Sequence, residues 1–316
     1  MYYLGIDLGG MSIKAGLCDE EGNILLQESC VTVRDEDGDR ITRDMADLCL
    51  RVLEKAGVSP ADVEYAGIAS PGSNDSERGV IVYACTLPFL HYPIAEKLSA
   101  LTGIRKVYID NDANAAAKGE ATFGAAKGYR DSVFLTLGTG VGGGIIVDGK
   151  IVSGFNFAGA ELGHTVIIHG GKECTCGRKG CLECYASATA LMEQTKEKME
   201  QCKDSLMWEL CDGKLENVSG RTAFDAMRAG DKAAMEVVDT YIGYLACGVT
   251  NFINVFQPEV FSIGGGISNE KDYLLEPLKA IVEKEQYSRN SDKKTIIKIA
   301  QLGNRAGIIG AASLGR

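Results

Sequence analysis

Two stretches decide the fold: GIDLGGMSIKAGL at residues 5–17 and LTLGTGVGGGIIVDGKI at residues 135–151. Each consists of an apolar strand sequence, a glycine-rich turn and a returning apolar strand, and a short turn then leads into a third strand. A pattern that recurs in one chain indicates a structural repeat. Helical segments follow each copy, so we expect an α/β protein built from two similar halves.

The pattern of apolar and turn-forming residues predicts the elements around these two stretches. Strands are expected at 2–8, 12–18, 24–33, 64–69, 106–109, 132–137, 144–147 and 260–263. Helices are expected at 42–56, 93–101, 111–123 and 231–256. Asp110 or Asn111 is the expected cap of the helix at 111–123, and residues 138–143 form the expected turn of the second copy.

The composition is that of a soluble globular protein, with 316 residues of which 45% are hydrophobic and 24% charged. The net charge of -10, without a dense basic run, argues against nucleic acid and against an anionic membrane surface as partners. The sequence shows neither a leader pattern nor an apolar run of membrane-spanning length. We therefore expect a cytoplasmic protein whose 11 cysteines are reduced.

Both glycine-rich turns could bind phosphate, because backbone N–H groups can approach an anion closely where no Cβ intervenes. Asp7 beside the first turn and the hydroxyl of Thr139 in the second favour a clamp for nucleotide phosphates over plain hairpin turns. Residues 138–143 also match the dinucleotide fingerprint G-x-G-x-x-G, but that motif opens a helix, and the residues at 145–147 are typical of a strand. We therefore expect a nucleotide clamp and no NAD site.

Four cysteines lie within a short glycine-containing segment, at Cys174, Cys176, Cys181 and Cys184, and His164 precedes them. Thiolates and imidazole are ligands that Zn²⁺ prefers, so this spacing predicts a structural zinc site. Two ligand sets are open: the four cysteines, or three of them with His164. A redox pair of Cys181 and Cys184 is disfavoured, because no thioredoxin-like strand and helix surround it.

Motifs spread along nearly the whole chain are those of a known family: GIDLGGMSIK, IDNDANAAAKGEA, AGAELGH, CTCGRKGCLE, QPEVFSIGGGIS and GNRAGIIGAA. With them the chain resembles the ROK sugar kinases (repressors, open reading frames, kinases), and among these the glucokinase-type members. The resemblance implies the actin-like/hexokinase (ribonuclease H-like) fold, in which two α/β domains surround a cleft where ATP and sugar meet. The implied domains are residues 1–117 with 301–316, closed by the C-terminal helix, and residues 118–300, which carry the zinc loop.

The resemblance also implies a reaction, the ATP-dependent phosphorylation of a hexose, with glucose at its 6-hydroxyl as the leading substrate. Asp112 matches the position of the family's general base, where a carboxylate would accept the proton of the sugar hydroxyl. The positions that match the family's sugar ligands are Asn111, Asp112, Glu161, His164 and Glu183. The positions that match its ATP-binding segments are Asp7, Gly9, Gly10, Lys14, Gly138, Thr139, Gly140, Gly264 and Gly265.

The family's zinc set is one histidine and three cysteines, which match His164, Cys174, Cys176 and Cys181. His164 would then hold zinc through one ring nitrogen and sugar through the other, so the zinc would position the sugar rather than act as a Lewis acid. Asp7 would hold Mg²⁺ through water, because this ion keeps much of its hydration shell. The expected ligands are thus ATP, Mg²⁺, a structural Zn²⁺ and a sugar, in a homodimer or homotetramer.

Five residues depart from the family pattern: Met11, Thr86, Ala160, Cys184 and Arg305. Met11 stands where a threonine or serine is usual, and Thr86 where an asparagine that binds a sugar hydroxyl is common. Allose, fructose, N-acetylmannosamine and N-acetylglucosamine therefore stay open as alternative substrates. A sugar-sensing repressor would carry an N-terminal helix-turn-helix, which we do not expect here because the first strand begins at residue 2. A non-catalytic sugar-binding protein is disfavoured because Asp112 is retained.

Overall fold

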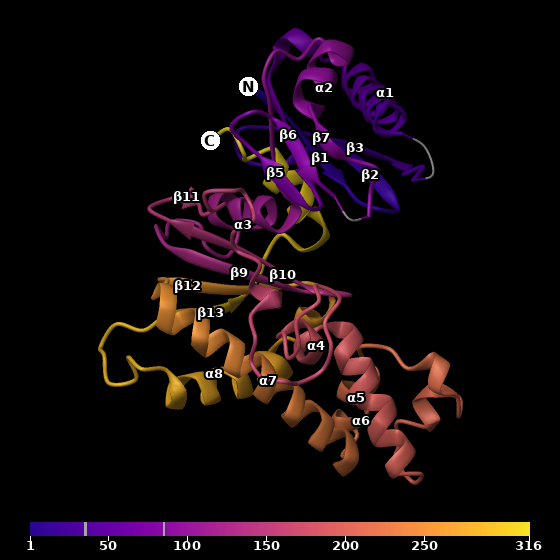
Figure 1. Cartoon of the computed structure of the whole chain (residues 1–316), viewed down its shortest axis with the longest axis vertical. Coiled ribbons are helices and arrows are strands. Elements are labelled where there is room, and N and C mark those ends of the chain that lie inside the picture. Colours follow the sequence, from indigo (N-terminus) through magenta and orange to yellow (C-terminus); the bar gives the residue numbers. More distant parts are fainter. Residues whose placement is uncertain (35–36, 85) are drawn as a thin grey trace. The chain divides into compact units, whose positions relative to one another are not determined.

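The computed structural model describes residues 1–34, 37–84 and 86–316. These residues form two compact units (Figure 1). Unit 1 consists of residues 1–130, 144–160 and 301–316, and unit 2 consists of residues 131–143 and 161–300. Residues 118–130 and 144–160 thus pack within unit 1, while the domain boundaries expected from the sequence stay a prediction.

Unit 1 is built on a five-stranded sheet of order β3-β2-β1-β4-β8. Its strands are β1 (Tyr2–Leu8), β2 (Ser12–Cys18), β3 (Ile24–Val31), β4 (Val63–Ser70) and β8 (Val107–Asn111). The first three form an antiparallel meander, and β4 and β8 continue the sheet in parallel with β1. A second, three-stranded sheet contains β5 (Ser73–Asp75), β6 (Val80–Tyr83) and β7 (Leu90–Tyr92). The strands predicted at 2–8, 12–18, 24–33, 64–69 and 106–109 are all present.

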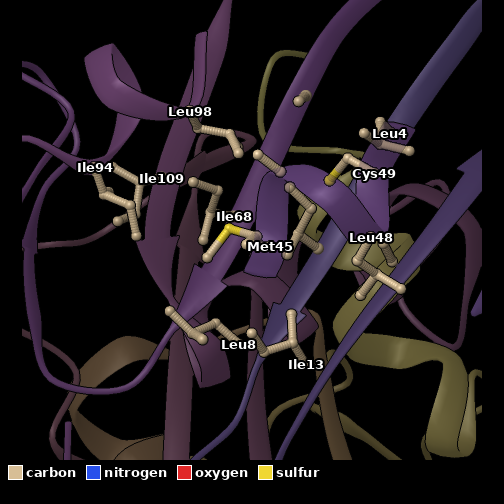
Figure 2. Packing of buried hydrophobic residues seen from close by; sticks show 14 of the residues in the cluster. Leu4, Leu8, Ile13, Met45, Leu48, Cys49, Ile68, Ile94, Leu98 and Ile109 are labelled. Carbon is tan, nitrogen blue, oxygen red and sulfur yellow. The ribbon is translucent and has the colours of Figure 1, made fainter. Parts of the chain in front are cut away.

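Helices α1 (Gly38–Ala56) and α2 (Ile94–Thr102) cover one face of the main sheet. Alternate residues of β1, namely Leu4, Ile6 and Leu8, point to this face and are buried. Figure 2 shows Leu4 and Leu8 in one apolar core with side chains from both helices. The helix predicted at 42–56 begins earlier, at Gly38, because the side chain of Asp37 caps it by accepting a hydrogen bond from the N–H of Arg40.

The opposite face carries α9 (Ala306–Ala311), which packs on the sheet and on α3 (Asp112–Phe123). A row of three paired glycines, Gly16, Gly5 and Gly67, crosses β2, β1 and β4 beneath α9. A Cβ on Gly5 would lie 1.9 Å from the carbonyl oxygen of Ile308, and a Cβ on Gly67 would lie 1.9 Å from that of Ala311. The backbone of α9 therefore rests directly on the backbone of the strands.

Glu120 of α3 holds the segment that leads into α9. Its carboxylate is buried and accepts hydrogen bonds from the N–H groups of Ala125, Gln301 and Leu302 at 2.7–3.1 Å. Such charge-assisted bonds compensate a buried carboxylate for its lost hydration. This residue thus ties the C-terminal segment to the first half of the chain.

Unit 2 contains the parallel strands β9 (Ser132–Leu137), β12 (Val260–Gly264) and β13 (Ile296–Ile299). Its helices are α4 (Glu183–Ala186), α5 (Ala188–Gln201), α6 (Thr222–Arg228), α7 (Lys232–Phe256) and α8 (Asp272–Glu285). The long helix α7 packs against the other four helices. Asp231 caps it, as its side chain accepts from the N–H of Ala234 at 2.8 Å. The helix predicted at 231–256 is confirmed to within one residue.

The two main sheets share one topology, which confirms the predicted repeat of α/β halves. The second sheet, with β10 (Val141–Val147) and β11 (Lys150–Ile151), has the order β11-β10-β9-β12-β13, which copies β3-β2-β1-β4-β8. The turn predicted at 138–143 is shorter, since β10 begins at Val141. Gly143 and Gly144 lie within the strand, where a Cβ would come within 2.6 Å of Leu162 or 2.5 Å of Ala117.

Short 3-10 helices connect these elements: η1 (Pro60–Asp62), η2 (Leu162–His164), η3 (Glu209–Cys211), η4 (Leu215–Asn217), η5 (Gly266–Glu270) and η6 (Gly303–Arg305). Within the described ranges, no helix combines the length and the apolar character that crossing a bilayer would require.

Candidate functional site

Asp112 is the first residue of α3 and follows β8 directly. Asn111 caps the helix, because its Oδ1 accepts from the N–H of Ala113 at 2.9 Å and from that of Asn114 at 3.3 Å. Its Nδ2 donates to the carbonyl of Gly72 at 3.2 Å. The side chain of Asn111 therefore fixes the backbone on which the carboxyl of Asp112 is mounted.

Asp112 is exposed to solvent as a residue, yet many protein atoms surround its carboxyl group and remove part of its hydration. This partial desolvation raises its pKa above the ordinary value. The N–H of Ala113, which donates to Oδ1 at 2.8 Å, lowers the pKa, and the negative charge of Asp7 raises it further. A carboxylate whose pKa is raised is a better proton acceptor near neutral pH.

Asp7 and Lys14 face each other across the β1–β2 ladder, and Lys14 Nζ lies 3.1 Å from Asp7 Oδ2. The carboxyl of Asp7 lies on the α9 side of the sheet, where a Cβ on Gly307 would come within 2.6 Å of it. The absence of a side chain at Gly307 therefore leaves space for this carboxylate. The structure brings together the two charged residues that the sequence predicts for the first nucleotide segment.

The turn after β1 contains Gly9, Gly10 and Met11. The hydroxyl of Thr32 donates to the carbonyl of Gly9 at 2.7 Å, and this bond holds the turn against the end of β3. The side chain of Met11 is 78% exposed and fills the position where the family usually has a hydroxyl. Thr86 lies beside this turn, because its Oγ1 would be 3.8 Å from a Cβ on Gly10.

The second glycine turn is held by the beginning of α5. The N–H of Ala188 donates to the carbonyl of Gly138 at 2.8 Å, and the hydroxyl of Thr189 donates to the carbonyl of Thr139 at 2.8 Å. Within the turn, the N–H of Gly138 donates to the carbonyl of Gly140 at 3.0 Å. These bonds use carbonyl groups, so the N–H of Thr139 has no part in them.

Glu183, the first residue of α4, contacts the same turn. Its Oε2 accepts from the N–H of Val141 at 2.9 Å, and a Cβ on Gly140 would lie only 2.3 Å from that oxygen. Any other residue at position 140 would push the carboxylate away. The structure thus places a predicted sugar ligand against a predicted phosphate-binding turn within unit 2.

Glu161 directly precedes η2, which ends at His164, and its carbonyl accepts from the N–H of His164 at 3.1 Å. Its side chain is exposed. Ala160 before it has φ of 61°, in the left-handed region that costs an alanine about 1 kcal/mol. The family's glycine would adopt this conformation without strain. The last predicted glycines lie at the end of β12, where Gly265 has φ of 83° and its carbonyl accepts from the hydroxyl of Ser268 at 2.7 Å.

A cluster of four side chains in unit 2 has the geometry of a metal site. The ligand atoms of His164, Cys174, Cys176 and Cys181 all lie within 4.8 Å of one another. The sulfurs of Cys176 and Cys181 are 3.7 Å apart, and the Sγ of Cys174 is 3.5 Å from Nδ1 of His164. A tetrahedron with bonds of about 2.3 Å to sulfur and about 2.0 Å to nitrogen has edges of about 3.5–3.8 Å. The donor set therefore fits an ion of the size and preference of Zn²⁺.

Cys184 lies outside this set, and its Sγ donates to the carbonyl of Glu173 at 3.5 Å. Burial raises the pKa of the Cys184 thiol to about 11, and the neighbouring Cys174 adds to the rise. Burial also acts to raise the pKa of Cys174, but hydrogen bonds from the N–H and thiol of Cys176, from Cys181 and from His164 lower it to about 7. A thiol that ionises near neutral pH is well suited to bind a cation.

Two supporting residues, Asp110 and Arg178, are absent from the predicted site. Asp110 is buried, and its Oδ1 accepts from the N–H of Asn111 at 2.7 Å and from Nδ2 of Asn114 at 2.9 Å. Arg178 donates from Nη1 to the carbonyl of His164 at 2.9 Å. Asp110 could have been found in the sequence, because it is an acidic residue at the end of a buried strand. Arg178 could not, because nothing distinguishes it from the other charged residues of its loop.

Comparisons with known proteins identify the relatives of this chain. The family model described as the ROK family matches residues 3–316. A glucokinase of Thermotoga maritima is 38% identical over 313 residues, with 98% of this chain and 96% of that enzyme covered. The crystal structure of a ROK family glucokinase from Streptomyces griseus in complex with glucose and AMPPNP has a TM-score of 0.83 at 33% identity, with 99% of each chain covered. A xylose repressor of Caldicellulosiruptor bescii is 30% identical, with 98% of this chain and 77% of the repressor covered.

Proposed function

Because this chain belongs to the ROK family, we propose that it is a kinase that transfers the γ-phosphoryl group of ATP to the 6-hydroxyl of glucose. The observation that carries the proposal is the position of Asp112. Its carboxyl is the first side chain of α3, its backbone is fixed by the cap that Asn111 forms, and its pKa is raised by partial desolvation. These are the properties of a positioned general base.

In the proposed reaction, the 6-hydroxyl oxygen of glucose attacks the γ-phosphorus of ATP. Asp112 accepts the proton of this hydroxyl as the new O–P bond forms, and the bond between the γ-phosphorus and the bridging oxygen breaks, so that ADP leaves with the electron pair. Phosphoryl transfer depends mainly on positioning and charge stabilisation, with little covalent chemistry for the protein to perform. Asp112 therefore has to orient the hydroxyl as well as take its proton.

We assign the ATP phosphates to the two glycine turns, with Gly9 and Gly10 in unit 1 and Gly138, Thr139 and Gly140 in unit 2. The N–H groups of Gly10, Thr139 and Gly140 would donate to phosphate oxygens, whereas the N–H groups of Gly9 and Gly138 donate within their own turns, to the carbonyls of Ser12 and Gly140 at 3.0 Å. Lys14 and Asp7 belong to the first segment. Asp7 would hold Mg²⁺ through water, and the ion would neutralise the negative charge that develops on the phosphates. Gly264 and Gly265 would border the adenosine.

We assign the sugar hydroxyls to Asn111 and Asp112 in unit 1 and to Glu161, His164 and Glu183 in unit 2. A Zn²⁺ ion in the cluster of His164 and the three cysteines would act as a structural support. His164 would bind it through Nδ1, the nitrogen that lies 3.5 Å from Cys174 Sγ, and would keep Nε2 for a sugar hydroxyl. Nη1 of Arg178 donates a hydrogen bond to the carbonyl of His164, and this bond would help to keep the imidazole ring in that orientation.

The direct test measures ADP formation by the purified protein with ATP, Mg²⁺ and a series of hexoses, and then locates the phosphate on the product by ³¹P NMR. We expect ADP formation that depends on glucose, and phosphate on the 6-oxygen. The variant Asp112→Asn serves as the control for contaminating kinases. Protein that forms no ADP with glucose or with any other hexose would overturn the proposal.

A further inference from the structure

A cavity of about 330 Å³ lies in unit 1. It is lined by residues of β8, by Lys118 of α3, by the turn that leads into β11 and by the C-terminal segment. None of the described residues that line it is a proposed ligand of sugar, nucleotide or metal. Its volume is at the lower end of the roughly 300–1,000 Å³ that small-molecule pockets occupy, so it suits a small metabolite. We name it the α3–β11 pocket.

Lys118 brings a partly buried ammonium group to this pocket. It forms no ion pair with any residue that the structure describes. Its Nζ lies 3.4 Å from the carbonyl oxygen of Gly149, which is longer than a normal hydrogen bond. Burial lowers the pKa of this group, because the charged form has lost part of its hydration. An anion that enters the pocket would compensate for that loss, and the ammonium group retains N–H donors for it.

Lys150 adds a second cation at the same place. It directly follows Gly149, so the contact of Lys118 with Gly149 sets both lysines at one turn. Lys150 is exposed and likewise has no acidic partner within the described ranges. Arg316 also lines the pocket, but its guanidinium donates to two backbone carbonyls between β2 and β3 and is engaged there. In a chain with a net charge of -10, two unpaired lysines at one cavity form a local site of positive charge.

Asp110 is the acidic residue among the described residues that line the pocket, and its carboxyl is already engaged. The residue is buried, and its Oδ1 accepts from the N–H of Asn111 at 2.7 Å and from Nδ2 of Asn114 at 2.9 Å. Burial raises its pKa, while the bonds from Asn114, Asn111 and Ser153 act in the opposite direction. These donors use the carboxylate, so the two lysines keep their charge for a ligand.

Two hydroxyl groups of the pocket decide which anion suits it. Ser76 and Tyr108 are not buried, and neither hydroxyl has a hydrogen-bond partner among the described residues. The ring of Tyr108 is held edge-on against Tyr65, with the centroids 5.1 Å apart. A phosphate group carries a charge of about −1.5 to −2 at neutral pH and has three strong acceptor oxygens. Two lysines and two hydroxyls therefore match a phosphate group better than a single carboxylate, which has one charge and two oxygens.

We propose that the α3–β11 pocket binds a phosphate group, that of inorganic phosphate or of a small phosphate monoester, between the ammonium groups of Lys118 and Lys150. The site is separate from the residues assigned to the phosphates of ATP, and binding there does not require the kinase reaction. The proposed function would supply one ligand of this class, because its product is a hexose phosphate. The pocket also adjoins the cap of α3, since Asp110 holds Asn111.

Equilibrium dialysis with ³²P-labelled inorganic phosphate tests this, in the presence of saturating Mg²⁺ and AMPPNP to fill the proposed nucleotide segments. We expect about one phosphate per chain, and Lys118→Gln and Lys150→Gln should each weaken its binding by about tenfold, the value of one charge-assisted hydrogen bond. Lys127→Gln is the matched control, because Lys127 is an exposed lysine of unit 1 outside the pocket, and it should leave binding unchanged.

Two further ligands define the chemistry of the site. Labelled malonate, a dicarboxylate, should bind more weakly than phosphate. Labelled glucose 6-phosphate distinguishes the sources of the phosphate group: binding that is tighter than that of inorganic phosphate and depends on Lys118 indicates a monoester, and weaker binding indicates the free ion.

Three results would overturn the site: no phosphate bound beside the nucleotide, folded Lys118→Gln and Lys150→Gln proteins that bind phosphate as wild type does, or malonate bound as tightly as phosphate. None of these measurements uses phosphoryl transfer. The site can therefore fail while the protein proves to be a glucose kinase, and it can be confirmed if the protein forms no ADP.

Discussion

Asn111 and Asp112 have different tasks although they are neighbours of similar size. Oδ1 of Asn111 accepts from the first N–H groups of α3, and one N–H of Nδ2 donates to the carbonyl of Gly72, which leaves the second N–H for the proposed sugar hydroxyl. The carboxyl of Asp112 accepts from the N–H of Ala113 at 2.8 Å and retains lone pairs for a substrate. A cap that fixes the helix therefore leaves the second residue available for chemistry.

The first prediction concerns the base itself. Asp112→Asn keeps the size of the side chain and removes its ability to accept a proton, so kcat should fall by about 10²–10⁴-fold. Binding of glucose and the thermal transition should persist, because Asn111 and not Asp112 provides the cap. Comparing kcat with a glucose binding constant tests this. Turnover within about tenfold of wild type would remove Asp112 from the role of general base.

The pH dependence follows from the direction in which the pKa of Asp112 shifts. Because the folded-state pKa is raised and the base acts when ionised, kcat/KM should fall on acidification at a pH above about 3.9, the ordinary value for Asp. Proton binding at this group favours the folded state at low pH, and that contribution is lost as the pH rises through the folded pKa. Asp112→Asn should therefore melt at or above the wild-type temperature at neutral pH. A kcat/KM profile that is flat down to about pH 4 contradicts the prediction.

The third prediction concerns the metal cluster. Carefully purified protein should contain about one zinc per chain, and His164→Asn or Cys176→Ser should lose it, since both side chains belong to the compact donor set. Cys184→Ser is the matched control and should retain the metal, because its thiol points to the carbonyl of Glu173. Elemental analysis decides the question. Metal retained by His164→Asn but lost from Cys184→Ser would indicate the four-cysteine set.

At the scale of elements, the contact of α9 with the sheet depends on three glycines that lie within strands and not in turns. Gly16, Gly5 and Gly67 lie side by side on three strands, and carbonyl groups of α9 occupy the space of two missing side chains. The sequence predicts the strands at these positions correctly. It does not predict the contact, because Ile308 and Ala311 are hundreds of residues away along the chain.

A pair of alanine substitutions tests this packing. In Gly67→Ala the new Cβ would lie 1.9 Å from the carbonyl oxygen of Ala311, so we expect a loss of about 1–3 kcal/mol or more in the free energy of unfolding. In Gly243→Ala, within α7, no neighbouring atom lies within 4 Å of the new Cβ, and the variant should gain about 0.5–1 kcal/mol. Denaturant unfolding measures both. Equal effects of the two substitutions would show that the glycine row is not required.

For the whole molecule, the fold could be predicted from the repeated strand–turn–strand pattern. The spacing of apolar residues along a strand is visible in the sequence whatever the strand packs against. The boundaries of that pattern could not: Gly142 and Gly143 look like turn residues, yet they belong to β10, where neighbouring Leu162 leaves no space for a side chain at Gly143. The cysteine cluster could be predicted because its ligands are close along the chain. The packing of α4 and α5 against α7 could not, since Tyr185, Gln194 and Tyr244 look like ordinary helix residues until the fold brings these helices together.

The last prediction concerns which sugar the whole molecule selects. We expect glucose to have the highest kcat/KM among glucose, mannose, allose, fructose, N-acetylmannosamine and N-acetylglucosamine. The reason is that five residues match the family's sugar ligands: Asn111, Asp112, Glu161, His164 and Glu183. Thr86 is the residue that works against glucose, because it is exposed beside Gly10 and has no amide to donate where the family often has asparagine. One hydroxyl contact is worth about tenfold in specificity, so its loss can reorder close competitors without abolishing phosphoryl transfer.

The measurement is kcat/KM for all six sugars under one set of conditions, followed by the same series with Thr86→Asn. If Thr86 is the cause of any loss of selectivity, the substitution should move the preference towards glucose by up to about tenfold, and Thr86→Val should not. Valine removes the hydroxyl without adding an amide, so it separates the effect of a new donor from the effect of filled space. A competing sugar more than about tenfold better than glucose would replace the substrate while leaving the reaction class unchanged, since Asp112 would still take the proton of whichever hydroxyl is presented to it.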